Sequence, residues 1–246
     1  MAQDKQVALI TGANKGIGLE TARQLGQRDI IVVVGARDQT KAEKAAKTLQ
    51  EEGVDARPLK LDVTKVGDRD AAVEFFDKNF GRLDILVNNA GVMVEGGWGG
   101  NNTVTVSAEA LQQTFETNFF APVLLTQALL PLLKKAPAAR IVNLSSIMGS
   151  LALHSDPKSP IYGSKAFAYD ASKSALNAFT IHLAHALRDS DIKVNSAHPG
   201  WVKTDMGTDA APMDIVEGAK TSVALATLDE NGPTGSYLHL GNTQPW

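Results

Sequence analysis

The chain has 246 residues, of which 43% are hydrophobic and 21% charged, and its formal net charge is −3. This is enough apolar material for one substantial core, because single α/β domains commonly reach this length. The balanced charge gives no sign of a nucleic-acid partner, and the absence of cysteine excludes disulfides, thiolate metal sites and cysteine nucleophiles.

Short runs rich in β-branched residues alternate with helical patterns along the chain. The expected strands are residues 7–10, 30–35, 57–61, 85–87, 140–144, 193–197 and 237–240. The expected helices are residues 16–27, 40–52, 66–79, 108–133, 169–188 and 215–228. Most strand runs are apolar without polar alternation, as in strands covered on both faces. This alternation predicts one doubly wound α/β domain, residues 1–246, with a parallel sheet of about seven strands and helices on both faces.

The start of the chain and its most apolar stretch bear on location. Residues 1–6 lead straight into a strand-like run and show no signal-peptide pattern. The most apolar long segment, residues 122–133, is too short to span a bilayer and contains Pro131. We therefore expect a soluble cytoplasmic protein with no membrane partner, and no metal site is predicted.

Two stretches do not fit the alternation of strand and helix. Residues 95–102 form a glycine-rich loop, and residues 150–165 form a second irregular segment. Both follow strands, and doubly wound folds bind ligands beyond the carboxyl ends of their strands. Long loops in compact domains are often functional, although a mobile surface loop is the alternative for each.

The first expected strand ends in a glycine-rich turn. Residues 11–18 read TGANKGIG and lead directly into the first helix. Glycines permit a tight turn and let the backbone approach a pyrophosphate, and the helix N-terminus offers unpaired N–H groups to that anion. Glycines alone are weak evidence, but their place between first strand and first helix indicates a dinucleotide (Rossmann-type) site.

The end of the second strand bears on which dinucleotide is bound. An acidic residue there would bind the ribose hydroxyls of NAD, whereas an arginine would accept the extra phosphate of NADP. Ala36 occupies the expected acid position and Arg37 follows it, while Lys15 adds a second cation from the turn. We favour NADP(H); the alternative is two solvated surface charges, with Asp38 capping the next helix.

Seven motifs follow one another along the chain. They are TGxxxGxG at residues 11–18, Leu61-Asp62-Val63, NNAG at residues 88–91, Asn118, Ser145-Ser146, Tyr169-xxx-Lys173 and Pro199-Gly200. By this series the chain resembles the short-chain dehydrogenase/reductase family over nearly its full length. Lys15 with Arg37 is similar to the NADPH-preferring, carbonyl reductase-like branch. The resemblance implies an oxidoreductase that transfers a hydride between NADPH and a carbonyl substrate, with a cofactor half of about residues 1–145 and a catalytic half of about residues 146–246.

The resemblance also implies which residues hold the cofactor. Asp62 would accept a hydrogen bond from the adenine amino group, Gly91 would admit the cofactor closely, and Thr204 would contact the carboxamide or the diphosphate. The NNAG motif also readily forms a plain turn at a strand end. The implied cofactor-binding set is Gly12, Asn14, Lys15, Gly16, Ile17, Gly18, Arg37, Leu61, Asp62, Val63, Asn88, Ala90, Gly91, Tyr169, Lys173, Pro199, Gly200, Val202 and Thr204.

Reduction of a carbonyl needs a hydride on carbon and a proton on oxygen, and the protein supplies the proton donor. A free tyrosine has a pKa of about 10, which a nearby ammonium lowers toward the working pH. Tyr169 and Lys173 are four apart and share one helix face. The resemblance adds that Lys173 contacts the nicotinamide ribose and that Ser146, rather than Ser145, orients the substrate oxygen.

A second tyrosine–lysine pair competes with this one. Tyr162 precedes Lys165 by three positions, and such a spacing can also share a helix face. Residues 169–173 open directly into an amphipathic helix, on which the family carries its pair, whereas Tyr162 lies in a stretch rich in serine and proline. We therefore assign the catalytic pair to Tyr169 and Lys173.

Asn118 stands four positions before Pro122. Proline has no N–H to donate, so the main-chain carbonyl of Asn118 is left free to bind water. In the family this asparagine holds a water that connects the lysine to solvent, and the resemblance makes Asn118 a fourth catalytic residue. A simple helix kink at Pro122 is the alternative, and both can hold.

The segment before the catalytic tyrosine departs from the family pattern. Tyr169 lies 23 positions after Ser146, farther than in the family's usual arrangement. The extra residues are expected to cover one side of the substrate cleft, and they put the pocket shape and the family's usual tetramer in doubt. His154, within this segment, is expected to be a solvated loop histidine because Tyr169 already fills the acid–base role.

Hydrophobic residues on the loops suggest the substrate. An apolar or aromatic carbonyl is expected because such pockets are lined by hydrophobic groups, although these side chains could equally plug the core. Residues 201–213 are similar to the family's mobile substrate lid. The candidate wall residues are Met93, Trp98, Leu151, Leu153, Trp201 and Met206.

Two other functions and the oligomeric state stay open. A 3-oxoacyl-carrier-protein reductase would use the same frame, and a non-catalytic NADPH sensor would keep the fold without needing the catalytic set. Small residues on the helix from Tyr169 (Ala171, Ala175 and Ala178) could pack between subunits or on the sheet. We expect a homo-oligomer, either a dimer or a tetramer.

Overall fold

The computed structural model describes residues 5–96 and 102–246. Its strands are β1 (Val7–Thr11), β2 (Ile31–Ala36), β3 (Ala56–Lys60), β4 (Ile85–Asn88), β5 (Arg140–Leu144), β6 (Lys193–Ala197), β7 (Tyr237–His239) and β8 (Asn242–Thr243). Its helices are α1 (Gly16–Gly26), α2 (Gln39–Glu51), α3 (Val66–Phe80), α4 (Ala108–Phe115), α5 (Ala121–Leu133), α6 (Leu151–Ser155), α7 (Phe167–Ala186) and α8 (Ile215–Ala226). Two short turns, η1 (Glu116–Phe120) and η2 (Ile147–Gly149), complete the elements.

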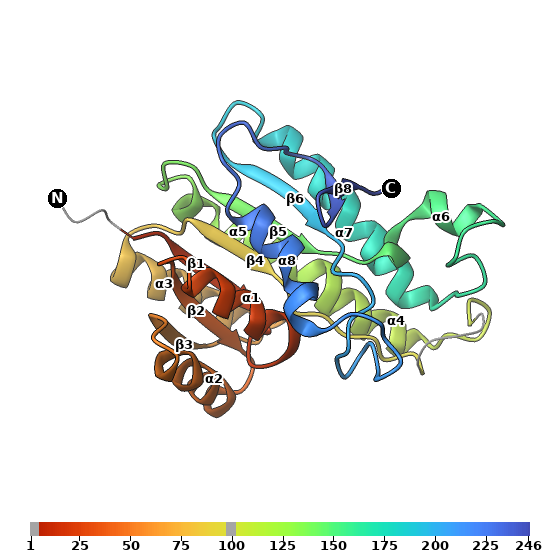
Figure 1. Cartoon of the computed structure of the whole chain (residues 1–246), viewed down its shortest axis with the longest axis horizontal. Coiled ribbons are helices and arrows are strands. Elements are labelled where there is room, and N and C mark those ends of the chain that lie inside the picture. Colours follow the sequence, from red (N-terminus) through yellow and green to blue (C-terminus); the bar gives the residue numbers. More distant parts are fainter. Residues whose placement is uncertain (1–4, 97–101) are drawn as a thin grey trace.

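The strands form one sheet in the order β3-β2-β1-β4-β5-β6-β7-β8 (Figure 1). The first seven strands pair in parallel, and only the two-residue β8 is antiparallel. Strand order reverses between β1 and β4, which is where doubly wound sheets open a crevice for ligands. The predicted doubly wound parallel sheet is confirmed, with one short strand beyond the expected seven.

Two hydrophobic cores cover the two faces of this sheet. On one face α3, α5 and α7 contribute buried side chains such as Phe76, Leu129 and Ala184. On the other face α1, α2 and α8 contribute side chains such as Leu25 and Leu49. Strands with apolar side chains on both faces explain why the sequence runs are apolar without alternation. No helix among the described residues is long and apolar enough to cross a membrane.

The predicted helix over residues 108–133 is interrupted. A π-helical turn, η1, separates α4 from α5, and Pro122 stands just after it. Because Pro122 cannot donate to the carbonyl four residues earlier, the chain accommodates one wide turn at this point. The wide turn lies at Asn118, whose side chain is fully buried.

The irregular segment at residues 150–165 is partly ordered into regular structure. The short turn η2 precedes it, its first residues form the short helix α6, and α7 begins at Phe167, two residues before the predicted start. Ser150 caps α6 by accepting a hydrogen bond of 3.1 Å from the N–H of Leu153. The glycine-rich loop falls largely outside the described residues, with Glu95 and Asn102 as its described flanks.

Candidate active site

The glycine turn forms a narrow cradle at the start of α1. Gly12 and Gly16 adopt φ angles of 63° and 58°, in the left-handed region that favours glycine. A Cβ atom on Gly18 would lie 2.5 Å from Asn89 Nδ2 and 2.8 Å from the Gly12 carbonyl oxygen. No side chain caps the first turn of α1. The turn therefore has the close backbone approach and the helix N-terminus that a pyrophosphate requires.

Thr11 and Asn89 brace this turn, and the sequence analysis named neither as a binding residue. Asn89 Nδ2 donates to the carbonyl oxygen of Thr11 at 2.7 Å. The hydroxyl of Thr11 accepts the N–H groups of Asn89 and Ala90, each at 3.0 Å. The NNAG motif is thus tied to the glycine turn as well as ending β4. Its first residue, Asn88, instead points inward and donates to Asn143 Oδ1 at 2.8 Å.

The two cations of the nucleotide prediction differ in their surroundings. Arg37 is exposed just beyond β2, and no carboxylate of the described chain forms an ion pair with it. Lys15 forms an ion pair with Asp205, which lies in the predicted lid. Asp38 caps α2 by accepting the N–H of Lys41 at 2.9 Å, so this part of the alternative interpretation also holds.

The turn after β3 holds the predicted adenine residue. Asp62 Oδ1 accepts the N–H of Thr64 at 3.1 Å and its hydroxyl at 2.7 Å. The flanking Leu61 and Val63 are buried in the core. One carboxylate oxygen of Asp62 therefore stabilises the local turn.

The Pro199-Gly200 motif leads into the predicted lid, residues 201–213, and the lid lies against the glycine turn. Gly200 has a φ of 93°, and a Cβ there would collide with Met213. Val202 is buried and pairs with Met213. Thr204 Cγ2 lies 3.7 Å from the Cβ position of Gly16, so Thr204 faces the cradle.

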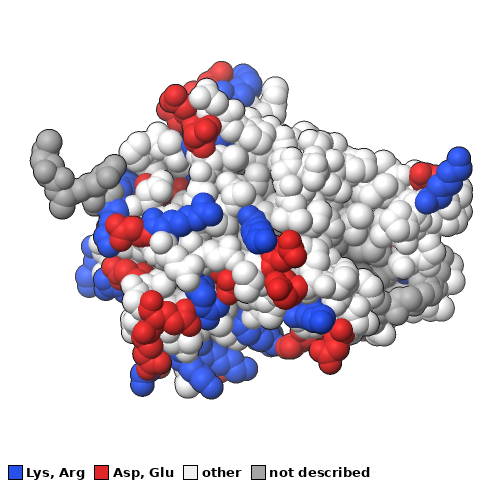
Figure 2. Space-filling model, in the orientation of Figure 1, with Lys and Arg blue, Asp and Glu red and all other residues white. Residues whose placement is uncertain are grey.

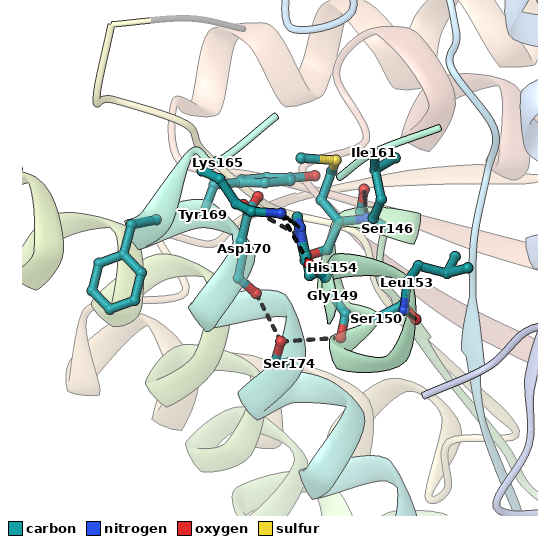
Figure 3. Close-up of polar contacts among 12 residues, drawn as sticks. Ser146, Gly149, Ser150, Leu153, His154, Ile161, Lys165, Tyr169, Asp170 and Ser174 are labelled. Carbon is teal, nitrogen blue, oxygen red and sulfur yellow. Dashed lines mark hydrogen bonds and ion pairs between the residues drawn. The ribbon is translucent and has the colours of Figure 1, made fainter. Parts of the chain in front are cut away.

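Tyr169, Lys173 and Ser146 come together at the carboxyl end of β5, and Figure 3 shows Tyr169 and Ser146 of this group. Tyr169 lies in the first turn of α7, and Ser146 follows β5 and lies close enough to the Tyr169 side chain to affect its pKa. The Lys173 ammonium lies 5.6 Å from the centre of the Tyr169 ring and donates to the carbonyl of Leu144 at 2.7 Å. The structure therefore assembles this predicted trio.

Burial sets the pKa values of the pair. It raises the pKa of Tyr169 to about 12, although the nearby Ser146 hydroxyl acts in the opposite direction. It lowers the pKa of Lys173 to about 8. Desolvation, and not the expected effect of the ammonium, therefore dominates the pKa of Tyr169 in this arrangement. The Tyr169 hydroxyl stays protonated at neutral pH and is available as a donor.

The competing pair is not assembled in this way. Tyr162 is 45% exposed and lies outside α7. The Lys165 ammonium lies 5.0 Å from the centre of the Tyr162 ring, but it also donates to His154. An exposed tyrosine on a surface turn has neither the burial nor the neighbouring serine of Tyr169.

Asn118 is joined to the loop after β4 and to α7. Its amide Nδ2 donates to the carbonyl of Val92 at 2.8 Å, and its Oδ1 accepts the Val92 N–H at 2.8 Å. Nδ2 also donates to the Ser172 hydroxyl at 3.0 Å, which in turn donates to the carbonyl of Tyr169 at 2.7 Å. A Cβ on Gly91 would lie 3.4 Å from Asn118 Oδ1 and 3.6 Å from Lys173 Nζ. Gly91 thus lies beside Asn118 and Lys173, with no room for a large side chain between them.

The prediction that His154 is a solvated loop histidine is wrong. Its side chain is only 12% exposed and lies against α7 (Figure 3). Nε2 hydrogen-bonds the Met148 carbonyl at 2.9 Å and lies 3.3 Å from Asp170 Oδ2, while Nδ1 lies 2.9 Å from Lys165 Nζ. Burial lowers the pKa of His154, so the neutral ring carries its hydrogen on Nε2 and accepts from Lys165 at Nδ1. The segment folds back because these polar groups partner one another.

An apolar cluster surrounds the Tyr169 side chain. Of the predicted wall residues, Met93, Leu153 and Met206 pack against it, Leu151 and Trp201 are exposed, and Trp98 lies outside the described residues. On the face in Figure 2, charged side chains gather over the half that carries α1 and α2, and few lie over α6 and α7. The buried members of the cluster are Met148, Ile161, Ala166 and Tyr169.

His198 is a residue that the sequence analysis did not identify. It is buried next to Pro199, and its Nδ1 accepts the N–H groups of Ile147 at 3.2 Å and Gly200 at 3.3 Å. Burial lowers its pKa to about 3, so the ring stays neutral and Nδ1 stays an acceptor. His198 therefore ties the segment after Ser146 to the Pro199-Gly200 motif. No spacing pattern in the sequence signals this contact.

Comparisons with known proteins agree with this geometry. The family model for short chain dehydrogenases matches residues 6–214, and the chain belongs to this family. It is 33% identical to (−)-isopiperitenone reductase of Mentha piperita, covering 97% of both chains. It is 32% identical to carbonyl reductase (NADPH) 1 of Mus musculus, covering 100% of both. The structure of NADPH-bound carbonyl reductase from chicken fatty liver superposes with a TM-score of 0.84 at 29% identity, covering 99% of this chain and 100% of that one.

Proposed function

We propose that this chain is an NADPH-dependent carbonyl reductase, an enzyme that reduces apolar or aromatic ketones or aldehydes. The observation that carries the proposal is the grouping of Tyr169, Ser146 and Lys173, with Lys173 one turn of α7 from Tyr169, inside an apolar cluster beside the glycine turn. The similarity to NADPH-dependent carbonyl reductases over the full chain supports both the cofactor and the reaction.

The cofactor would lie along the carboxyl ends of the central strands, mostly against residues 1–145. The fit rests on the cradle at Gly18, which any side chain there would fill, and on the uncapped start of α1. Arg37 and Lys15 would bind the 2′-phosphate, Asp62 the adenine, Gly91 the nicotinamide ribose side, and Thr204 the carboxamide or the diphosphate. When bound, NADPH supplies the hydride.

The residues of the chain would supply the proton and the geometry. Ser146 would donate a hydrogen bond to the substrate oxygen and hold it within reach of the Tyr169 hydroxyl. Tyr169 would donate its proton to that oxygen, and a protonated resting state suits reduction more than oxidation. The Lys173 ammonium would stabilise the tyrosinate that remains and contact the nicotinamide ribose. Asn118, at the π-helical turn, would hold the water that returns a proton.

The apolar cluster supports an uncharged, bulky substrate. Three methionines, Met93, Met148 and Met206, surround the donor, and methionine side chains adapt to irregular shapes. A 3-oxoacyl thioester attached to a carrier protein would need cationic side chains at the entrance for its phosphate. On the face that Figure 2 shows, few charged side chains lie over α6 and α7. We place the enzyme in the cytoplasm, as a homo-oligomer.

The test is NADPH consumption by the purified protein with a panel of ketones, aldehydes and an acetoacetyl thioester. Tyr169→Phe should reduce turnover by roughly 10²- to 10⁴-fold, the usual contribution of a general acid, with unchanged NADPH affinity. Tyr162→Phe, on the exposed pair, is the matched control and should keep full turnover. NADPH binding without turnover of any carbonyl would instead favour a non-catalytic sensor.

A further inference from the structure

We infer that Glu95 is a positioning residue for the proton donor: from the loop after β4, its carboxylate caps the catalytic helix α7 at Tyr169 itself. The inference rests on the proposed function, in which Tyr169 gives its proton to the substrate. Glu95 touches neither the reacting atoms nor the expected cofactor path, so its effect would pass through the backbone of Tyr169.

The start of α7 has no cap of its own. Its N-cap residue, Ala166, forms no side-chain hydrogen bond, although the first N–H groups of any helix need partners. Glu95 Oε1 accepts the N–H of Tyr169 at 2.6 Å, and Oε2 accepts the N–H of Ala168 at 2.9 Å. Asn102 Oδ1 accepts the N–H of Phe167 at 2.9 Å. Two side chains from a distant loop thus satisfy the first three N–H groups of α7.

Three other helices are capped differently. Asp38, Ser107 and Asp214 each accept an N–H three residues later and cap α2, α4 and α8 from within the local sequence. The cap of α7 comes from residues 65 to 74 positions earlier. A local cap fixes only the helix end, whereas this long-range cap fixes the position of α7 relative to the loop that follows β4.

Asn102 holds the Glu95 carboxylate in its capping position. Its Nδ2 donates to Glu95 Oε2 at 2.8 Å, and its own N–H donates to the carbonyl of Lys165 at 3.2 Å. Asn102 therefore contacts the carboxylate and both sides of the N-cap residue. A carboxylate with three donors at a helix N-terminus is also stabilised by the helix dipole.

The same loop passes the other catalytic residues before it reaches Tyr169. Gly91 lies against Asn118 and Lys173, and Val92 is clamped to Asn118 by two hydrogen bonds. Three residues later Glu95 binds the Tyr169 backbone. One short segment thereby sets the distance between the cofactor edge at Gly91 and the donor on α7. Small displacements of a reacting group cost large factors in rate, so this spacing matters for turnover.

The test compares the Glu95→Ala and Glu95→Gln variants with the wild type on a carbonyl that the wild type reduces. Glu95→Ala should lower kcat by roughly ten- to a hundredfold, because the donor is misplaced. The Kd for NADPH and the KM for the carbonyl should stay near wild-type values. Glu95→Gln keeps one oxygen acceptor for the Tyr169 N–H and should recover most of the lost kcat.

Ser107→Ala is the matched control, because it removes the cap of α4 without touching α7. It should lower the melting temperature to a similar degree as Glu95→Ala and leave kcat unchanged. A Glu95→Ala enzyme with wild-type kcat would overturn the inference about Glu95 and leave the proposed function standing. If Glu95→Ala does not fold, the folded Glu95→Gln enzyme decides instead. A Glu95→Gln enzyme whose kcat and NADPH affinity fall in parallel would overturn the inference, because the loss of turnover would not then come from the position of Tyr169. No turnover by the wild type would overturn the proposed function as well.

Discussion

The ammonium of Lys173 donates a hydrogen bond of 2.7 Å to the main-chain carbonyl of Leu144, the last residue of β5. This contact holds the charge beneath the Tyr169 ring, in a place where burial lowers the lysine pKa to about 8. A backbone carbonyl stabilises the ammonium without supplying a negative charge. The charge of Lys173 is therefore lost as the pH rises through about 8.

We expect turnover of a carbonyl to fall as the pH rises through about 8. Lys173 is charged below its pKa, and by pH 9 only about a tenth of the molecules would keep the ammonium. Tyr169, with a pKa of about 12, stays protonated over the same range, so the decline reports the lysine. The measurement is kcat against pH from 6 to 9.5.

Lys173→Arg provides the control for this profile, because arginine keeps its charge at every accessible pH. Its turnover should be low, since a guanidinium does not fit the buried position, but it should not decline above pH 8. A wild-type profile that stays flat to pH 9.5 would contradict the role of the ammonium.

A second titration should be visible in stability. Burial, with the nearby charge of Glu95, raises the pKa of Asp170 to about 8 from an unfolded value near 3.8. Between those values the folded chain holds a proton that the unfolded chain releases, so stability falls as the pH rises from about 4 to 8. Asp170→Asn mimics the protonated carboxyl and should be more stable than the wild type by about 1–3 kcal/mol at pH 8, the cost of a buried unsatisfied group.

Urea unfolding at several pH values measures this difference. The advantage of Asp170→Asn should shrink as the pH falls and approach zero near pH 3, below the unfolded pKa of about 3.8, where the wild-type carboxyl is protonated in both states. Asp189→Asn, on an exposed carboxylate, should leave the pH dependence of stability unchanged. An advantage that is the same at pH 4 and pH 8 would show that Asp170 is ionised in the folded chain.

The architecture could be predicted because it depends on local patterns. Apolar runs such as residues 30–35 need two covering layers, and a glycine-rich turn after the first strand permits few alternatives. The Tyr169–Lys173 pair could be placed because a spacing of four marks one helix face. The family resemblance added Ser146, and the structure brings all three residues together.

The remaining features depend on contacts between distant parts of the chain. The burial of His154 requires Asp170 and Lys165 to face it across a folded segment, and no local pattern encodes that. The cap on α7 comes from Glu95, far outside the window in which capping residues are sought. The π-helical turn could be predicted only in part. Pro122 shows that one N–H donor is missing from the helix, but it does not show that a π-helical turn takes the place of the regular one.

The choice of NADPH over NADH should depend on Arg37. The side chain is exposed beyond β2, where Ala36 leaves room for a phosphate, and a charged hydrogen bond contributes about 1.5–3 kcal/mol. Arg37→Ala should therefore weaken NADPH binding by about ten- to a hundredfold and leave NADH binding unchanged. Asp205→Asn should act in the opposite direction, because it releases Lys15 from its ion pair. Fluorescence titration with both cofactors measures these affinities, and equal losses for NADPH and NADH in Arg37→Ala would contradict the assignment.

The proposed homo-oligomer has a candidate contact on the outer helices. Phe120, the last residue of η1, and Leu124 on α5 are 46% and 41% exposed, and Ile181 on α7 is 42% exposed. Single exposed apolar residues are ordinary, but a group on neighbouring elements, here with η1 in contact with both α5 and α7, is typical of a subunit interface. Sedimentation of the wild type should give a dimer or a tetramer, and Leu124→Lys with Ile181→Lys should shift it toward smaller species. Val216→Lys, on the opposite helical layer at α8, is the control and should not. A wild type that sediments as a monomer would exclude this interface, and would indicate that the extended segment before Tyr169 is compatible with a single-chain enzyme.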